Sequence, residues 1–347
     1  MSASELTSRK KTDLQIELGE LKSEKHSVKK DLNLMLVCKL LLPVLLWGIF
    51  WVAHLFIADR QILTGGKYFN WLMITLLGLY LIFLVISYFI SNIRSGLVHK
   101  VPLISAVLMI LLIWELTTLK LNLLPLPYFP PPAKVFAALA IDWQTLWISV
   151  LYSLRLLGIG YLIGLLVGLP CGTLMGWYAG FNYWLNPVLR FIGPIPATAW
   201  IPVAMAVFPT SFAASIFLIA LASWFPITVM TWSGIANVNK AFYEVARTLG
   251  GGEYYLITRV AVPAALPSIF VGLFMGMGTA FVTLVVGELL GVKAGLGWYI
   301  QWAQGWAEYA KVYAALFVMA VIFSGLITLL FRIRDKVLVW QRGLIKW

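Results

Sequence analysis

The sequence predicts an all-α polytopic membrane protein with about eight transmembrane helices. Of its 347 residues, 61% are hydrophobic and only 12% are charged, which is about half the charged fraction of a soluble domain. Several apolar runs exceed the roughly 20 residues that a helix needs to cross the hydrocarbon core. The alternating segments typical of a membrane β-barrel are absent from the sequence. The composition and the length of the apolar runs therefore both predict a helical membrane protein.

The expected spans follow from the apolar runs. They lie at about 36–58, 71–93, 101–119, 156–177, 191–208, 213–232, 266–290 and 314–331. A proline-rich stretch at 124–132 ends any helix after the third span, because proline lacks the backbone donor and clashes with the preceding turn. An amphipathic segment near 134–150 leads to the fourth span. The fifth span is broken by Pro194, Pro196 and Pro202.

The basic residues predict the orientation of the chain. With the N-terminus in the cytoplasm, 19 of the 26 Lys and Arg side chains lie on the cytoplasmic side, as the positive-inside bias requires. This places both termini and the 233–265 loop in the cytoplasm. The net charge of +12 does not indicate nucleic-acid binding, because the basic residues flank the spans and form no basic face.

Motifs for enzyme chemistry are missing from the sequence. Cys38 and Cys171 lie in apolar runs without metal-type spacing. No P-loop sequence is present, so nucleotide binding by that motif is not expected. A nucleophile motif of the G-x-S-x-G kind is also absent. We therefore expect neither a catalytic nor a metal site, and no enzyme activity in this chain.

The 233–265 loop is polar and broken by glycine. Glu244–Leu249 suits a helix, which the glycines at 250–252 cannot continue cheaply. Glu253–Val260 suits a second short helix, and Pro263 is expected to separate it from the seventh span. The small Ala246 is expected to let a partner surface come close. A docking surface and an interfacial amphipathic loop are both consistent with these residues.

This loop resembles a known signature. The pattern Glu-x-Ala-x3-Gly-x9-(Ile/Val)-x-(Leu/Val)-Pro is that of permease subunits of ABC importers of type I. Its positions are occupied by Glu244, Ala246, Gly250, Val260, Val262 and Pro263. Val245 departs from the alanine that is frequent there. Further similar stretches are Trp114-Glu115, Leu124–Pro127, Ser153–Arg155, Pro194–Pro196, Gly287–Gly291 and Gly295–Gly297, and together they look like the nitrate, sulfonate, taurine and bicarbonate branch.

The sequence and the resemblance together predict a domain layout. From the sequence, residues 1–33 form a charged cytoplasmic segment and 34–100 hold two extra helices. The resemblance implies that 101–335 form the six-helix permease core. Residues 336–347 form a cytoplasmic tail. The first 100 residues lie outside the resemblance. The turn after the fifth span, Phe208–Ser211, also departs from the family's usual Phe-Gly-x-Gly-type sequence.

The resemblance also implies partners and a location. It implies a homodimer in the prokaryotic cytoplasmic membrane, two ATPase subunits that hold ATP and Mg²⁺, and an extracytoplasmic binding protein. No cofactor is then expected on this chain. The residues expected to couple to the ATPase are Glu244, Val245, Ala246, Arg247, Gly250, Val260 and Pro263.

Candidates for the translocation path come from irregular backbone and intramembrane charge. Broken backbone at membrane depth is tolerated where it lines a cavity, and an ionisable group in a span is a functional candidate by default. These candidates are Pro196, Thr198, Trp200, Thr210, Ser211 and Glu288. The first five of these residues are equally consistent with a kinked helix that has only a packing role. For Glu115 and Glu288 a structural role near the outer interface, where water lowers the cost, is favoured; Arg155 is a candidate partner.

Glycines at a strict four-residue spacing, from Gly160 to Gly176, mark one face of the fourth span. They indicate tight helix packing or a moving interface.

Two other function classes stay open on residues alone. An ATP-independent secondary transporter or channel would need paired charges or matched broken helices, and a membrane enzyme would need a catalytic constellation. The resemblance favours import of a small anion, with pyrimidine-type cargo as an alternative.

Overall fold

A computed structural model describes residues 36–61, 66–289 and 292–341 of the chain, and in this part it contains helices and no strand. The predicted all-α class is confirmed. The segment 1–33 and the end of the tail lie outside the described residues. The chain divides into two compact units, residues 1–137 and 138–347, which are described separately.

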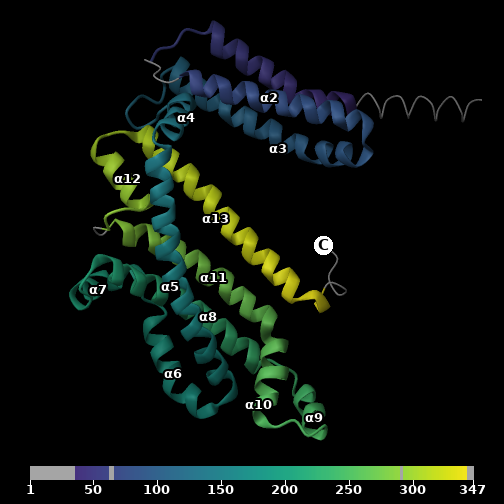
Figure 1. Cartoon of the computed structure of the whole chain (residues 1–347), viewed down its shortest axis with the longest axis vertical. Helices are drawn as coiled ribbons and strands as arrows, with labels where there is room; N and C mark the ends of the chain where they lie inside the picture. Colours follow the sequence, from purple (N-terminus) through teal and green to yellow (C-terminus); the bar gives the residue numbers. More distant parts are fainter. Residues whose placement is uncertain (1–35, 62–65, 290–291, 342–347) are drawn as a thin grey trace, which may run out of the picture. The chain divides into compact units, whose positions relative to one another are not determined.

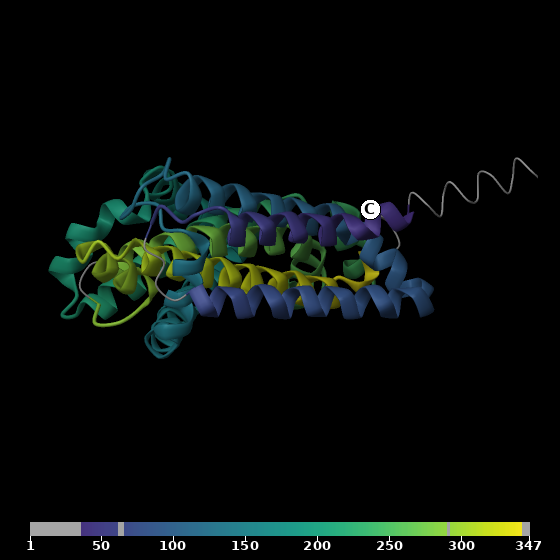
Figure 2. The same ribbon diagram turned by 90° about the horizontal axis from the view of Figure 1, so that it is seen from above.

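The first unit is built on three long helices. They are the helix Leu36–Phe56, α2 (Gly66–Phe89) and α3 (Ser91–Glu115), and α3 continues as a π-helical turn, Leu116–Lys120. Their axes run nearly parallel in both views (Figures 1 and 2). Their shared core contains Trp47, Phe50, Phe69, Met73 and Leu108. The short helix α4 (Pro132–Ile141) follows the proline-rich stretch.

The second unit carries the other helices. They are α5 (Trp143–Trp177), α6 (Ala179–Ile192), α7 (Ile201–Val207), α8 (Ser211–Ala236), α9 (Lys240–Thr248), α10 (Glu253–Tyr255), α11 (Val262–Glu288), α12 (Leu296–Gly305) and α13 (Tyr309–Val337). A 3₁₀ turn, Ala197–Trp200, precedes α7, and a π-helical segment, Leu256–Ala261, joins α10 to α11. In Figure 1, α9 and α10 lie beyond one end of α8 and α11.

The predicted spans are found with one correction. Seven described helices are long and apolar enough to cross a membrane, and a bent helix pair counts as an eighth if it forms one span. The fifth span was expected at 191–208, broken by prolines. The structure has two helical arms here, Ala179–Ile192 and Ala197–Val207, that meet at 88°, so the broken segment begins earlier than expected. Pro194 and Pro196 lie between the arms, where they remove two backbone donors and end the first helix.

The glycine face of α5 packs against α8. A Cβ placed on Gly160 would come within 2.7 Å of Ile219 Cβ, and one on Gly176 would come within 2.7 Å of Ile235 Cβ. Without side chains, the two backbones approach closely. The two helices run in the same direction, because the paired residue numbers rise together. Tight packing within one chain therefore explains this face.

α11 packs on α8 in the opposite direction. Gly272 lies against Met230 and Gly287 lies against Ser215. Since α5 and α8 are parallel, the bent pair α6–α7 returns the chain to the far end of the bundle before α8 starts. At the other end, Leu338 shares a core cluster with Ile235. The end of α13 and the 233–265 loop therefore lie at the same end of this unit.

Candidate functional site

The first arm of the 233–265 loop is a well-terminated helix. Asn239 is the N-cap of α9, and its Oδ1 accepts the backbone N–H of Ala241 at 3.0 Å, which satisfies one of the free donors at a helix start. At the other end, the N–H of Gly250 donates to Arg247 O and the N–H of Gly251 donates to Ala246 O, both at 2.9 Å. These two bonds form a Schellman ending.

Gly250 allows that helix ending to form without backbone strain. Its φ is +84°, a conformation that costs a residue with a Cβ about 1–2 kcal/mol. A Cβ at Gly250 would meet no atom within 4 Å. The glycine is therefore required here by backbone conformation and not by crowding within the chain. The sequence-based expectation of a helix ending at these glycines is confirmed.

The second arm differs from the expectation. Residues 253–288 form one continuous helical segment, Glu253–Glu288, and the predicted separation at Pro263 is wrong. Pro263 lies in the first turn of α11, directly after the π-helical segment Leu256–Ala261. A proline is tolerated there because the ladder is already altered in the preceding wide turn. The loop is thereby continuous with α11.

The two ends of the motif meet in one groove. Val245, Gly250 and Val260 line a concavity of about 410 Å³, together with Phe242, Ala246, Leu249, Gly251, Gly252 and Tyr255. The apolar side chains on α9 are exposed here, Val245 by 60% and Leu249 by 84%. Phe242, Val245 and Leu249 follow one another at three- and four-residue spacing, so they share one face of α9. We call these three side chains the apolar face of α9.

Ala246 and Glu244 are oriented differently. Ala246 is buried, with 9% of its surface exposed, and it lines the bottom of the groove. The expectation that its small side chain lets a partner surface come close remains a prediction. Glu244 and Arg247 are exposed and border a second, larger concavity of about 1020 Å³. α9 thus has an apolar groove on one side and charged residues on the other. The coupling role of these residues remains a prediction.

The end of α5 contacts this loop through residues that the sequence did not single out. Trp177 Nε1 donates to Glu253 Oε1 at 3.0 Å, and the Trp177 ring meets Tyr243 edge-on at 5.3 Å between centroids. Desolvation, together with the nearby Glu253 carboxylate, raises the pKa of the Tyr178 hydroxyl. We call Trp177, Tyr178, Tyr243 and Glu253 the α5 junction.

The candidate path residues near the bent pair either cap or begin a helix, or lie partly exposed in the turn. Thr210 is the N-cap of α8, and its Oγ1 accepts the N–H of Ala213 at 3.2 Å. Ser211 is the first residue of α8. Thr198 and Trp200 are half-buried in the 3₁₀ turn, and Pro196 is exposed. Pro196, Thr198 and Trp200 lie at the bend, whereas Thr210 and Ser211 lie at the start of α8. The place of these residues in a path remains a prediction.

Glu288 is completely buried and tied to three helices. Ser153 Oγ donates to Glu288 Oε1 at 2.5 Å, and the N–H of Gly297 donates to Oε2 at 2.7 Å. Ser153 Oγ also accepts the N–H of Leu296 at 2.9 Å. Gly295, with φ +137°, lies so close that a Cβ would come within 2.5 Å of Glu288 Cδ. Glu288 therefore holds the start of α12 against α5 and α11.

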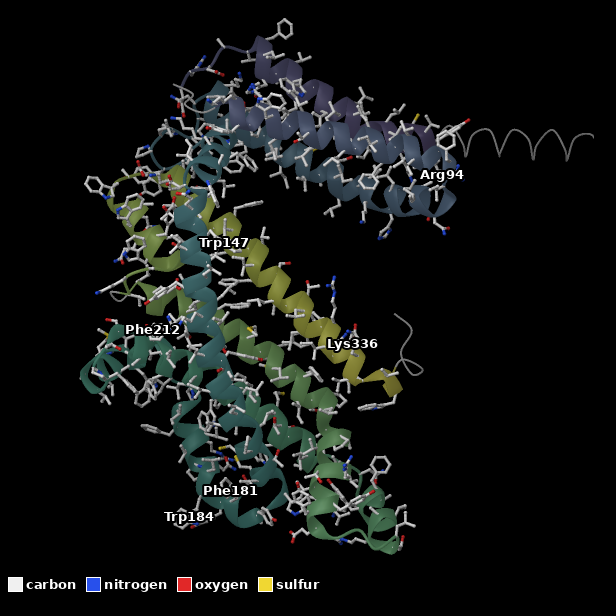
Figure 3. The ribbon with its side chains drawn as sticks, in the orientation of Figure 1. Arg94, Trp147, Phe181, Trp184, Phe212 and Lys336 are labelled. Atoms are coloured by element: carbon white, nitrogen blue, oxygen red, sulfur yellow. The ribbon has the colours of Figure 1, made fainter. Side chains whose placement is uncertain are left out.

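Two expectations about this carboxylate are corrected. Water was expected to lower the cost of Glu288 and Glu115 near an interface, but both are 0% exposed, and protein hydrogen bonds take that role. Arg155 is not the partner of Glu288 among the described contacts. Its guanidinium lies over the ring of Phe212, at 5.3 Å from the centroid. Phe212, labelled in Figure 3, lies at the start of α8.

The first unit contains a second buried polar cluster. His54 Nδ1 lies 2.8 Å from Glu115 Oε1, and the two side chains are 8% and 0% exposed. Lys120 Nζ donates to His54 O and Ile57 O, each at 2.7 Å, and to Asp59 Oδ1 at 2.6 Å. A cation at the end of the helix Leu36–Phe56 is favourable because carbonyl groups there lack partners. His54 thus pairs with Glu115 at the end of α3.

These features define a class of protein. The chain is a multi-pass helical membrane protein whose second unit presents a capped, exposed helix between two long spans. The model of the family of binding-protein-dependent transport system inner membrane components matches residues 160–338, which lie wholly in that unit. The chain belongs to this family, and it is therefore an ABC transporter permease by family.

Relatives support the same assignment. A probable ABC transporter permease protein of Brucella melitensis is 33% identical over 118 residues, which is 34% of this chain and 48% of the relative. The bicarbonate transport system permease protein CmpB of Synechococcus elongatus is 31% identical over 124 residues, 36% of this chain and 43% of the relative. The nitrate import permease protein NrtB of Leptolyngbya laminosa is 30% identical over 123 residues, 35% of this chain and 44% of the relative. The match spans less than half the length of each of these relatives.

Proposed function

We propose that this chain is the membrane-spanning subunit of an ATP-driven importer and that the 233–265 loop docks a separate ATPase subunit. The observation that carries the proposal is the apolar face of α9. Phe242, Val245 and Leu249 are exposed on a helix that also carries Glu244 and Arg247. Clustered exposed apolar side chains beside charged ones are typical of protein interaction sites. Docking here would act directly on α8 and α11, because the loop joins these two helices.

The proposed cargo is a small anion. Two of the relatives are named for bicarbonate and nitrate, and the sequence resembles the branch that also takes sulfonates and taurine. The proposed assembly is a homodimer with two ATPase subunits and an extracytoplasmic binding protein, in the cytoplasmic membrane with both termini inside. ATP and Mg²⁺ are held by the ATPase, so ATP chemistry is assigned to the partner.

A secondary transporter is the competing function, and the bent pair α6–α7 is the observation that favours it. Such transporters place broken helices at the substrate site, in corresponding positions of two repeats. Within the described residues one helix pair is bent by more than 40°. A single broken crossing fits an importer subunit better than a transporter built from two structural repeats.

The test of the proposal is copurification followed by transport. The full chain is coexpressed with an ABC ATPase subunit of the same organism, and ATPase retention is measured for the wild type, Glu244→Lys and the charge-reversal control Arg94→Glu. We expect retention for the wild type and the control and loss for Glu244→Lys. Uptake of labelled nitrate, bicarbonate and taurine into proteoliposomes is then measured with and without ATP. Uptake by the chain alone without ATP would overturn the proposal in favour of the competing function.

A further inference from the structure

The three helices around the 233–265 loop are joined to it in different ways. α8 leads into the loop and α11 leads out of it, so both follow its movement through the chain itself. α5 ends at Trp177, and its hydrogen bond to the loop joins residues 76 positions apart in sequence. Any movement of α5 with the loop therefore depends on side-chain contacts.

The interface between α5 and α8 is a close backbone contact. Its α5 side consists of backbone at five glycines, opposite Ile219, Ser223, Ile227, Thr231 and Ile235. Small residues let the two helices approach closely. This contact lies along the length of the two helices and does not include the 240–255 part of the loop.

The α5 junction connects the end of α5 to both arms of the loop, in addition to the bond from Tyr161 on α5 to Leu273 O on α11. Glu253 is the first residue of α10, where a negative charge is favourable at the positive end of a helix. From there its carboxylate accepts a hydrogen bond from Trp177. Tyr243, on α9, packs edge-on against the Trp177 ring. Both arms of the loop thus contact the end of α5.

We propose that the α5 junction makes α5 move together with the 233–265 loop, so that docking on α9 displaces α5 as well as α8 and α11. The proposal rests on the proposed function for its biological meaning, but the physical link exists in the chain by itself. Glu253 acts here as a positioning residue, through α5. Its charged hydrogen bond to Trp177 favours the joined state by about three- to tenfold, the lower value applying to an exposed group.

The test measures the distance between α5 and α9 by pulsed EPR in the full chain. Spin labels are attached to the native Cys171 on α5 and to Thr248→Cys on α9, in a chain with Cys38→Ser. The labelled chain is diluted with an excess of unlabelled chain so that a homodimer holds one labelled copy. Without ATPase, the wild type is then expected to give one narrow distance distribution. Glu253→Ala is expected to broaden it because the joined state loses its charged acceptor. Glu253→Gln keeps an acceptor for the Trp177 N–H and should restore most of the narrow distribution.

Controls separate this link from the fold and from ATPase docking. Thr258→Val removes a local bond to Tyr254 O outside the junction, and it should leave the distribution unchanged. Equal widths for the wild type and Glu253→Ala would overturn the proposal. The same chains are then measured with ATPase, ATP and vanadate: the distance should stay constant in the wild type and shift in Glu253→Ala. Failure of the wild type to retain ATPase would sink the proposed function and leave the first comparison valid.

Discussion

Gly250 offers a sharp test because a matched glycine lies two residues away. Gly250 and Gly252 belong to the same turn, and a Cβ on either would meet no atom within 4 Å. They differ in backbone conformation, since Gly250 has φ +84° and Gly252 has φ −75°. Gly250→Ala and Gly252→Ala therefore add the same methyl group with and without backbone strain.

The expected magnitude follows from that difference. A left-handed conformation costs an alanine about 1–2 kcal/mol, and about 1.4 kcal/mol is a tenfold change in an equilibrium constant. If the ATPase binds the turn as it is in this structure, Gly250→Ala should weaken binding by about tenfold. Gly252→Ala should change binding by less than about threefold, because its φ is compatible with alanine.

The assay is the affinity of the purified ATPase for each variant in lipid nanodiscs, measured by biolayer interferometry. Circular dichroism of each variant checks that the helices are retained. Equal affinities for Gly250→Ala and Gly252→Ala would refute the argument, because they would show that the left-handed turn has no part in docking.

Two further predictions concern stability, each measured by thermal unfolding in detergent. Gly172→Ala places a Cβ within 2.5 Å of Thr228 O and should destabilise the chain by about 1–3 kcal/mol. The control Gly158→Ala lies on the same helix, where the new Cβ meets nothing within 4 Å, and it should be neutral or stabilising. Similar unfolding temperatures for the two variants would contradict the packing of α5 on α8. His54→Ala leaves Glu115 buried without its partner and should lower the free energy of unfolding by about 1–3 kcal/mol. The control His99→Ala, at an exposed site, should lower it little. Equal losses of stability in the two variants would exclude a role for the His54–Glu115 pair.

Local patterns in the sequence predicted the elements of this fold well. Long apolar runs gave the spans because a helix in lipid must be apolar along its length. The helix ending at Gly250 was predictable from glycine's tolerance of positive φ. The four-residue spacing from Gly160 to Gly176 indicated a close helix contact, which the structure places on α8.

Contacts between distant residues were not predictable in the same way. The pairs His54–Glu115 and Trp177–Glu253 join residues 61 and 76 positions apart, and no periodic pattern records such a pairing. The apolar face of α9 was visible as the three- and four-residue spacing of Phe242, Val245 and Leu249. This short apolar pattern is hard to recognise in the sequence because the loop as a whole is polar.

The most direct measurement of the central claim is crosslinking from Leu249, the most exposed of the three residues on the apolar face of α9. A photoreactive amino acid at position 249 is activated in cells that coexpress the full chain and its ATPase. Docking on this loop predicts an adduct whose mass equals the chain plus the ATPase, and no such adduct from position 184 on α6. Crosslinks from position 249 to lipid, to an external binding protein or to no protein would contradict the account.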